Sequence, residues 1–292
     1  MLNLNAISNK SNFKMNRQER VAAAIKEVVT TMMDRVMVRV LEEDPFVKEE
    51  HHSSKPLYAA LVPDEIFKGS HFERRFVTPF GKVWEKLANV VATEVHGKCI
   101  MGHAIEGTVS TERLRRIQET LNRLEHSPKD TAKQKPDWDT EMAYILEGKG
   151  EPIPVTVVCD IYVENEKTGE KYAFELKAPL PNSDQTKVSK EKIFKLLAME
   201  PLHITAAFYA LPYNPYGKKE NYKWGFPMRW FNMQKDRTVL IGDEFWDLIG
   251  GKGTYQNFIS EINLLGKEYR ERIYREFLEI EPPANSQDNI LK

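Results

Sequence analysis

Apolar residues recur every three or four positions in several segments of the chain, which is the spacing of one face of an α-helix. The first segment runs from residue 16 to about 41, and its wide apolar stripe consists of Val21, Ala24, Ile25, Val28, Val29, Met32, Met33, Val36 and Val40. So wide a stripe belongs to the core or to a dimer interface. The same spacing predicts helices over 70–77, 79–95, 111–124, 138–146, 187–199, 243–249 and 255–277. Thr78-Pro79 reads as the N-cap and first residue of the second of these.

Other segments are continuously apolar or alternate with a period of two, which predicts β-strands. They cover residues 97–106, 155–160, 172–177, 203–211 and 226–232. Polar loops are predicted over 49–55 and 126–137, and a turn at Asn214-Pro215-Tyr216-Gly217. The order helix, strand, strand, helix, strand predicts an α/β fold with a central mixed β-sheet flanked by helices on both faces.

The same pattern predicts one principal domain. Residues 1–14 are rich in Asn, Ser and Lys and read as a flexible tail, and residues 278–292 read as a second tail. Between them, 15–277 forms a single domain with a helical N-terminal part over 15–95 and a core over about 70–255.

Charged residues gather on the two strands that flank the turn signal Glu166-Lys167-Thr168-Gly169-Glu170, so we predict a β-hairpin there. A connecting loop of even length, 168–169 or 167–170, pairs Asp160 with Lys177 and Tyr162 with Glu175. Asp160, Glu175 and Lys177 then share one face of the sheet, whereas a three-residue loop would place Asp160 on the other face.

Two carboxylates and a lysine on one face suit a Mg²⁺ site, because Mg²⁺ binds one or two carboxylates and keeps several waters. Such an ion polarises a phosphodiester and activates water. Lys177 would then position or deprotonate the attacking water. The alternative is a cross-strand Asp–Lys ion pair on an exposed sheet face. The apolar residues before Asp160 and after Lys177 favour a functional site.

Composition limits the classes of function. With 41% hydrophobic and 29% charged residues, the chain has the balance of a soluble protein with a core. No apolar run approaches the ~20 residues of a membrane helix, and residues 1–15 lack the apolar stretch of a signal peptide. Cys99 and Cys159 have no metal-site spacing and indicate a reducing compartment, so we expect a cytoplasmic protein. A net charge of -1 leaves nucleic-acid binding open, because the local field decides it.

Asp160 and the triplet Glu175-Leu176-Lys177 together resemble the motif of the PD-(D/E)XK nuclease superfamily, although Cys159 stands where that motif has Pro. Longer stretches are similar to the TdeIII group of type II restriction endonucleases. These are 72–76 (FERRF), 175–186 (ELKAPLPNSDQT), 214–217 (NPYG) and 245–255 (FWDLIGGKGTY). The resemblance implies Mg²⁺-dependent cleavage of double-stranded DNA at a short palindrome, with GGNCC associated with that group.

The resemblance also implies roles for individual residues. Asp160 and Glu175 would hold the metal, and Lys177 would lie beside the attacking water. The superfamily often adds a glutamate from a helix, for which Glu85 is one candidate and Glu73 another. Each of these two is otherwise an ordinary residue of a helix surface.

Candidate DNA contacts come from base chemistry, since Arg and Lys suit guanine and Asn and Gln suit adenine. They are Lys218, Lys223, Arg229, Asn214 and Tyr216 around the predicted turn, and Gln185, Thr186 and Lys187 in the loop that follows the catalytic strand. Most such residues would contact phosphates, and packing is the alternative for the tyrosine.

A palindromic target is read most simply by a two-fold homodimer. We expect no nucleotide cofactor, because Gly250-Gly251-Lys252-Gly253-Thr254 lacks the spacing of a phosphate-binding loop and reads as a helix end and turn. A cognate DNA methyltransferase is expected in the same system, although not as a bound partner. Two other functions remain open: a structure-directed repair or recombination nuclease of the same fold, and a DNA-binding protein without catalysis.

Overall fold

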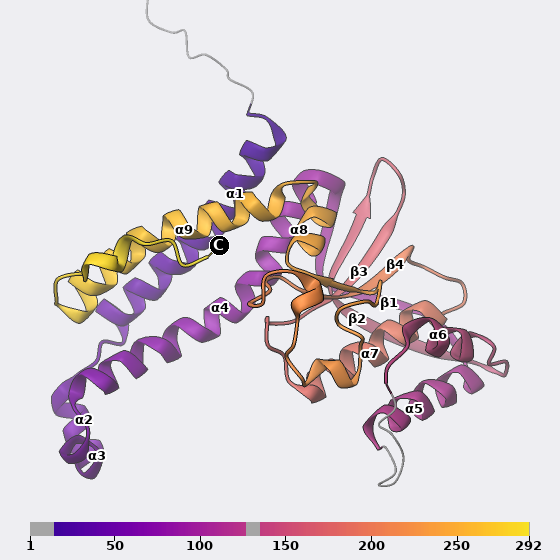
Figure 1. The fold of residues 1–292 in the computed structure, drawn as a ribbon, viewed down its shortest axis with the longest axis horizontal. Coiled ribbons are helices and arrows are strands. Elements are labelled where there is room, and N and C mark those ends of the chain that lie inside the picture. The colour runs from indigo at the N-terminus through magenta and orange to yellow at the C-terminus, as the bar shows by residue number, and fades with distance from the viewer. Residues whose placement is uncertain (1–14, 127–134, 292) are drawn as a thin grey trace, which may run out of the picture.

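A five-stranded mixed β-sheet lies at the centre of the computed structural model, which describes residues 15–126 and 135–291 (Figure 1). The predicted tail over 1–14 and most of the predicted loop over 126–137 lie outside these residues. The strands are β1 (Gly97–Ser110), β2 (Pro152–Asn165), β3 (Lys171–Leu176), β4 (Ala206–Leu211) and β5 (Val239–Ile241), and they lie in this order across the sheet. β1, β2 and β3 are antiparallel, whereas β3, β4 and β5 are parallel. The prediction of an α/β fold with a mixed sheet is confirmed.

Four helices cover one face of the sheet: α1 (Arg17–Val38), α4 (Asp64–His96), α8 (Asp243–Gly250) and α9 (Thr254–Arg272). α1 begins with a capping box, in which the Asn16 side chain accepts from Glu19 N and the Glu19 side chain accepts from Asn16 N. Its apolar stripe is buried in a cluster shared with α4 and α9. The stripe therefore belongs to the protein core and not to a dimer interface.

Three helices cover the opposite face: α5 (Thr111–Glu125), α6 (Trp138–Leu146) and α7 (Ser183–Ala198). α7 crosses over between the parallel strands β3 and β4. Its Lys190 is fully buried, donates to Glu141 of α6 at 2.5 Å and to the Trp230 carbonyl, and has the Phe231 ring 5.0 Å from its ammonium. Burial raises the pKa of Glu141 and lowers that of Lys190. Nearby Asp236 has its pKa raised to about 6, chiefly by burial.

One long helix, α4, replaces the two helices predicted over 70–77 and 79–95, and Pro79 lies inside it. A proline normally ends or kinks a helix because it donates no hydrogen bond. Side chains four residues apart bridge the proline in an aromatic row: Phe76 stacks on Phe80 at 5.0 Å between ring centroids, and Phe80 meets Trp84 at 5.3 Å. This tertiary packing overrides the local signal of Thr78-Pro79.

Three other predictions were wrong. Residues 49–55 were expected to form a loop, but 49–54 belong to the short helix α2 (Lys48–Ser54), which precedes α3 (Pro56–Leu61). Residues 226–232 form a 3₁₀ turn, Pro227–Arg229, instead of a strand, since Trp230 N donates to the Pro227 carbonyl. α7 begins at Ser183 with Asn182 as its N-cap, so four residues assigned to the preceding loop, 183–186, are helical.

The remaining segments are short. π-helical turns follow α1 (Arg39–Glu43) and α9 (Ile273–Leu278), and 3₁₀ turns cover Lys219–Asn221 and Ala284–Gln287. Gly251 ends α8 at φ 86° and Gly253 precedes α9 at φ 90°, which confirms the predicted helix end and turn. The last described residues pack on α9, where Asn263 exchanges two hydrogen bonds with Leu291. Across the described ranges, no helix has the length and apolar character needed to span a bilayer.

Candidate active site

The predicted hairpin forms, with a register two residues from the expected one. Tyr162 pairs with Ala173 and Ile161 with Phe174, which puts Asp160 opposite Glu175. The connecting turn covers 166–169, and Asn165 N donates to the Glu170 carbonyl at 2.8 Å to close it. Since the shift is an even number of residues, every side chain keeps its predicted face.

Asp160 lies where the β1–β2 ladder is interrupted. Met101 pairs with Ile161 and His103 with Cys159, and Gly102 between them has φ 61°. Val157 and Cys159, before this irregularity, pack in the cluster that includes α7, whereas Ile161 and Val163, after it, pack in the cluster that includes α4 and α8. The Asp160 carboxylate accepts a hydrogen bond from Leu176 N at 2.8 Å, so it satisfies the backbone at the end of β3. The interruption thus fixes the carboxylate beside the end of the neighbouring strand.

Three oxygens converge on the ammonium of Lys177. Its Nζ lies 2.6 Å from Asp160 Oδ2, 3.1 Å from the main-chain oxygen of Leu176 and 3.4 Å from Glu175 Oε2. The structure therefore brings together the three residues of the predicted site. Burial lowers the pKa of Lys177, but the two carboxylates outweigh it, and the net shift is upward.

Glu175 is held from its other side by α7. Its Oε1 accepts from Lys192 Nζ at 2.8 Å, and its Oε2 accepts from Ser189 Oγ at 3.3 Å. The side chain is 2% exposed, and burial, followed by the charge of Asp160, raises its pKa. Sequence reasoning missed both α7 residues. Ser189 and Lys192 lie three positions apart on one face of the helix. A crossover helix that directly follows a strand packs on that strand, so this polar pair could have indicated a contact with Glu175.

The two candidate glutamates of α4 lie in different places. Glu85 is close enough to the cluster for Asp160 to raise its pKa after burial, while Lys177 lowers it. Glu73 precedes Glu85 by twelve residues, which is about 18 Å along a helix axis. Only Glu85 therefore borders the cluster.

The oxygens around Lys177 form a donor set that suits a hard divalent cation. Asp160 and Glu175 contribute carboxylates, and Leu176 contributes a carbonyl. The Lys177 ammonium occupies the position between these oxygens that a cation would take. In the part of the chain that the structure describes, no three His, Cys, Asp or Glu side chains gather as a metal-binding group. An ion here would therefore complete its shell with the carbonyl and waters, as Mg²⁺ commonly does.

Comparison with known proteins shows the family of this chain. The family model for the type II restriction endonuclease HinfI matches residues 21–266. The chain belongs to the HinfI family of type II restriction endonucleases. Two relatives from Herpetosiphon aurantiacus are similar over most of their length: the type II restriction enzyme HgiCII is 27% identical over 233 residues, and HgiBI is 24% identical over 235 residues. Each alignment covers 77% of this chain and 82% of the relative.

The predicted class of enzyme, a site-specific deoxyribonuclease, is thereby confirmed, and DNA is its substrate. The matched region contains the entire cluster around Lys177. The TdeIII grouping, the PD-(D/E)XK assignment, the metal and the recognition sequence remain predictions.

In this endonuclease, the candidate DNA contacts of α7 differ in accessibility. Gln185 is exposed in the first turn of α7. Thr186 is buried and its hydroxyl bonds the Asn182 carbonyl and the Tyr209 hydroxyl, which is a packing arrangement. Lys187 forms an ion pair with Glu125 and lies over the Trp230 ring. Of the three, only Gln185 is freely presented to solvent.

The candidates around the 214–217 turn divide in the same way. Asn214 is buried and its side chain accepts from Tyr216 N at 2.9 Å, which stabilises the predicted turn. Tyr216 is half-buried, and the Lys223 ammonium lies 5.5 Å from its ring centroid. Lys218, Lys223 and Arg229 are exposed, so these basic residues are the ones accessible to a phosphate backbone.

Proposed function

We propose that the chain is a Mg²⁺-dependent endonuclease of the TdeIII group, with the PD-(D/E)XK active site, that cuts both strands of DNA at a short palindrome. The observation that carries the proposal is the convergence of Asp160, Glu175 and the Leu176 carbonyl on one cationic position. GGNCC is the proposed recognition sequence, and it rests on resemblance alone.

Each residue of the cluster would have a separate role in cleavage. Asp160 and Glu175 would hold the Mg²⁺ ion, which supplies Lewis-acid stabilisation of the scissile phosphate and lowers the pKa of a bound water. Lys177, displaced from the carboxylates, would orient the attacking water and offset charge on the phosphate. Glu85 would act as the additional acid of the site, since it lies close enough to Asp160 and Lys177 for their charges to act on it. Glu73 is too distant along α4 to share this role.

DNA binding would use the exposed basic residues Lys218, Lys223 and Arg229, together with Gln185 of α7. Asn214 and Tyr216 would shape the turn that presents them, and Lys187 would need to leave its ion pair with Glu125. Two copies of the chain would place one active site on each strand of a palindrome. We expect the enzyme to act in the cytoplasm beside a methyltransferase that protects the host sites.

The test is digestion of phage DNA by the purified protein with Mg²⁺ or EDTA, with Glu175→Gln as the matched variant. Discrete Mg²⁺-dependent fragments that the variant does not produce would support the proposal, and sequencing their ends would test GGNCC. A continuous smear would instead identify a nuclease without sequence preference. A gel shift without cleavage would identify a DNA-binding protein without catalysis.

A further inference from the structure

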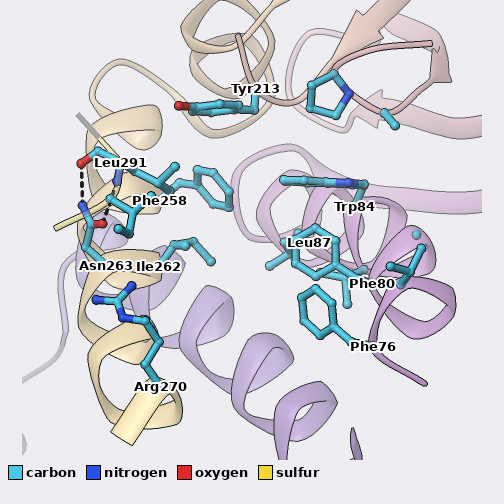
Figure 2. Close-up of a pocket in the computed structure, with 17 residues that line it drawn as sticks. Phe76, Phe80, Trp84, Leu87, Tyr213, Phe258, Ile262, Asn263, Arg270 and Leu291 are labelled. Carbon is cyan, nitrogen blue, oxygen red and sulfur yellow. Dashed lines mark hydrogen bonds between the residues drawn. The ribbon is translucent and has the colours of Figure 1, made fainter. Parts of the chain in front are cut away.

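An apolar hollow opens between α4 and α9, next to the catalytic segment (Figure 2). Its volume is about 590 Å³, and its walls include Val77 and Trp84 of α4 and Phe258 and Ile262 of α9. Pro179, two residues after Lys177, closes one end. Figure 2 shows the aromatic rings of α4 directed across the hollow toward α9. An open apolar hollow of this size on a water-soluble surface is typical of a binding site.

A second apolar surface lies at the other end of α4. The short helices α2 and α3 form a projecting tip far from the sheet (Figure 1). At this tip Leu57, Tyr58 and Leu61 are 77%, 60% and 81% exposed, and Ile66 in the first turn of α4 is 63% exposed. The chain therefore carries an apolar projection and an apolar hollow on one long helix.

The projection and the hollow face the same direction. At 100° per residue, Ile66, Val77 and Trp84 lie within about 20° of one line along α4. Ile66 and Trp84 are eighteen residues apart, which is about 27 Å along the helix axis. A copy of α4 laid antiparallel on this line would bring each projection onto the other copy's hollow.

We propose that a second copy of this chain occupies the hollow, through antiparallel packing of the two α4 helices about a two-fold axis that lies level with residue 75, on the face of α4 opposite the Arg75 side chain. Ile66 of each copy then faces Trp84 of the other, and α3 covers the hollow. In an isologous contact of this kind, the projection of each copy is buried in the hollow of the other. The inference rests on the proposed two-fold assembly and names its surface.

Charges near the centre of this line are complementary across the axis. Glu73 and Arg74 are exposed, and neither forms an ion pair within the described residues. In the antiparallel arrangement, each Glu73 comes within one helical turn of the partner's Arg74. Two symmetric ion pairs would therefore form at the centre of an apolar interface, where they select the antiparallel register.

The glycines of α4 fit the same register. Gly69 and Gly81 are placed symmetrically about residue 75, and a Cβ atom added to either would meet nothing within 4 Å. Glycine in a helix interior is unfavourable compared with alanine, by about 1 kcal/mol. Nothing within one copy requires these two glycines, whereas close approach of a second helix would.

The contact would also reach the active site. The hollow is bounded by Ala178 and Pro179, which directly follow Lys177. A partner side chain packed there would restrain the segment that carries the lysine. Assembly would thus favour cleavage only when two copies are together, as paired cuts require.

The test is the mass of the protein by sedimentation equilibrium at micromolar concentration, without DNA or metal. We expect a dimer, and we expect Glu73→Arg and Arg74→Glu each to weaken it about tenfold or more, because each places like charges across the axis. The double variant, Glu73→Arg with Arg74→Glu, restores opposite charges and should recover the dimer. Ile66→Asp should weaken it without a compensating partner, and Lys26→Glu, an exposed change on α1, serves as the control.

Circular dichroism of each variant separates loss of the dimer from loss of folding. Single variants that remain dimeric, or a double variant that fails to recover, would overturn this surface and leave the proposed dimer standing. A monomeric wild type would overturn both, while Mg²⁺-dependent cutting by that monomer would leave the nuclease function intact. A wild-type monomer that loses thermal stability when residues 1–14 are deleted would overturn the inference in favour of that segment as occupant.

Discussion

Lys177→Met should make the protein bind a divalent cation more tightly while it loses cleavage. The ammonium contacts the same three oxygens that would hold the ion, at 2.6, 3.1 and 3.4 Å. Even with the dielectric constant of water, a unit charge about 4 Å from a divalent cation costs about 2 kcal/mol, or roughly thirtyfold in affinity. The Lys177 side chain is only 19% exposed, so screening is weaker here and the gain in affinity should exceed tenfold.

Calorimetric titration with Mn²⁺ in the absence of DNA measures this affinity directly. Lys195→Met is the matched control, because Lys195 lies on α7 in an ion pair with Glu191 and outside the cluster. The Lys177 variant should also be less stable than wild type in EDTA, by about 1–3 kcal/mol, since the buried carboxylate of Glu175 and the half-buried carboxylate of Asp160 lose a partner. Added cation should restore that stability. Unchanged or weaker Mn²⁺ binding would refute the idea that the lysine occupies the cation position.

Three further predictions concern buried charges. Asp236 has a folded-state pKa of about 6 against an ordinary 3.8, because burial favours its protonated form. Its contribution to stability is therefore fully present below pH 4 and is lost as pH rises through 6. Asp236→Asn should therefore match wild type near pH 4 and exceed it by about 1–3 kcal/mol at pH 8 in urea unfolding; equal stability at both pH values would contradict this. Lys190→Met should cost about 3–5 kcal/mol, and adding Glu141→Leu should recover most of it, which a double-mutant cycle measures; additive losses would contradict the buried pair. Lys192→Met should slow cleavage about 10–100-fold at unchanged KM for DNA, because Glu175 loses the donor that orients it, and Lys192→Arg should retain most activity; a change in KM alone would contradict a positioning role.

Local patterns predicted the elements whose signals lie within one segment. The first helix and the hairpin follow from periodicity and turn residues, and so does the face shared by Asp160, Glu175 and Lys177. The two-residue shift in register was not predictable, because turns over 166–169, 167–170 and 168–169 are all compatible with the residues there. Because the register shift is an even number of residues, the three side chains of the site remain on one face of the sheet.

Features that depend on tertiary contacts were missed. The continuity of α4 through Pro79 depends on aromatic rings that also pack against α9, and β5 is only three residues long. The hold of Lys192 on Glu175 requires the crossover geometry that sets α7 against β3. The interruption opposite Gly102 depends on pairing between strands more than fifty residues apart. These features arise from packing between distant segments, which single-segment patterns do not contain.

The uninterrupted α4 sets a limit on how this chain can diverge. Removing one residue between Ile66 and Glu85 would shorten the helix by about 1.5 Å and rotate everything beyond the deletion by about 100°. Glu85 would then turn away from Asp160, or the projecting tip of α2 and α3 would turn away from the direction of the hollow. Length changes among relatives should therefore be absent from this helix and gather in connections such as the 166–169 turn. Alignments that place gaps inside α4 should prove to be misaligned.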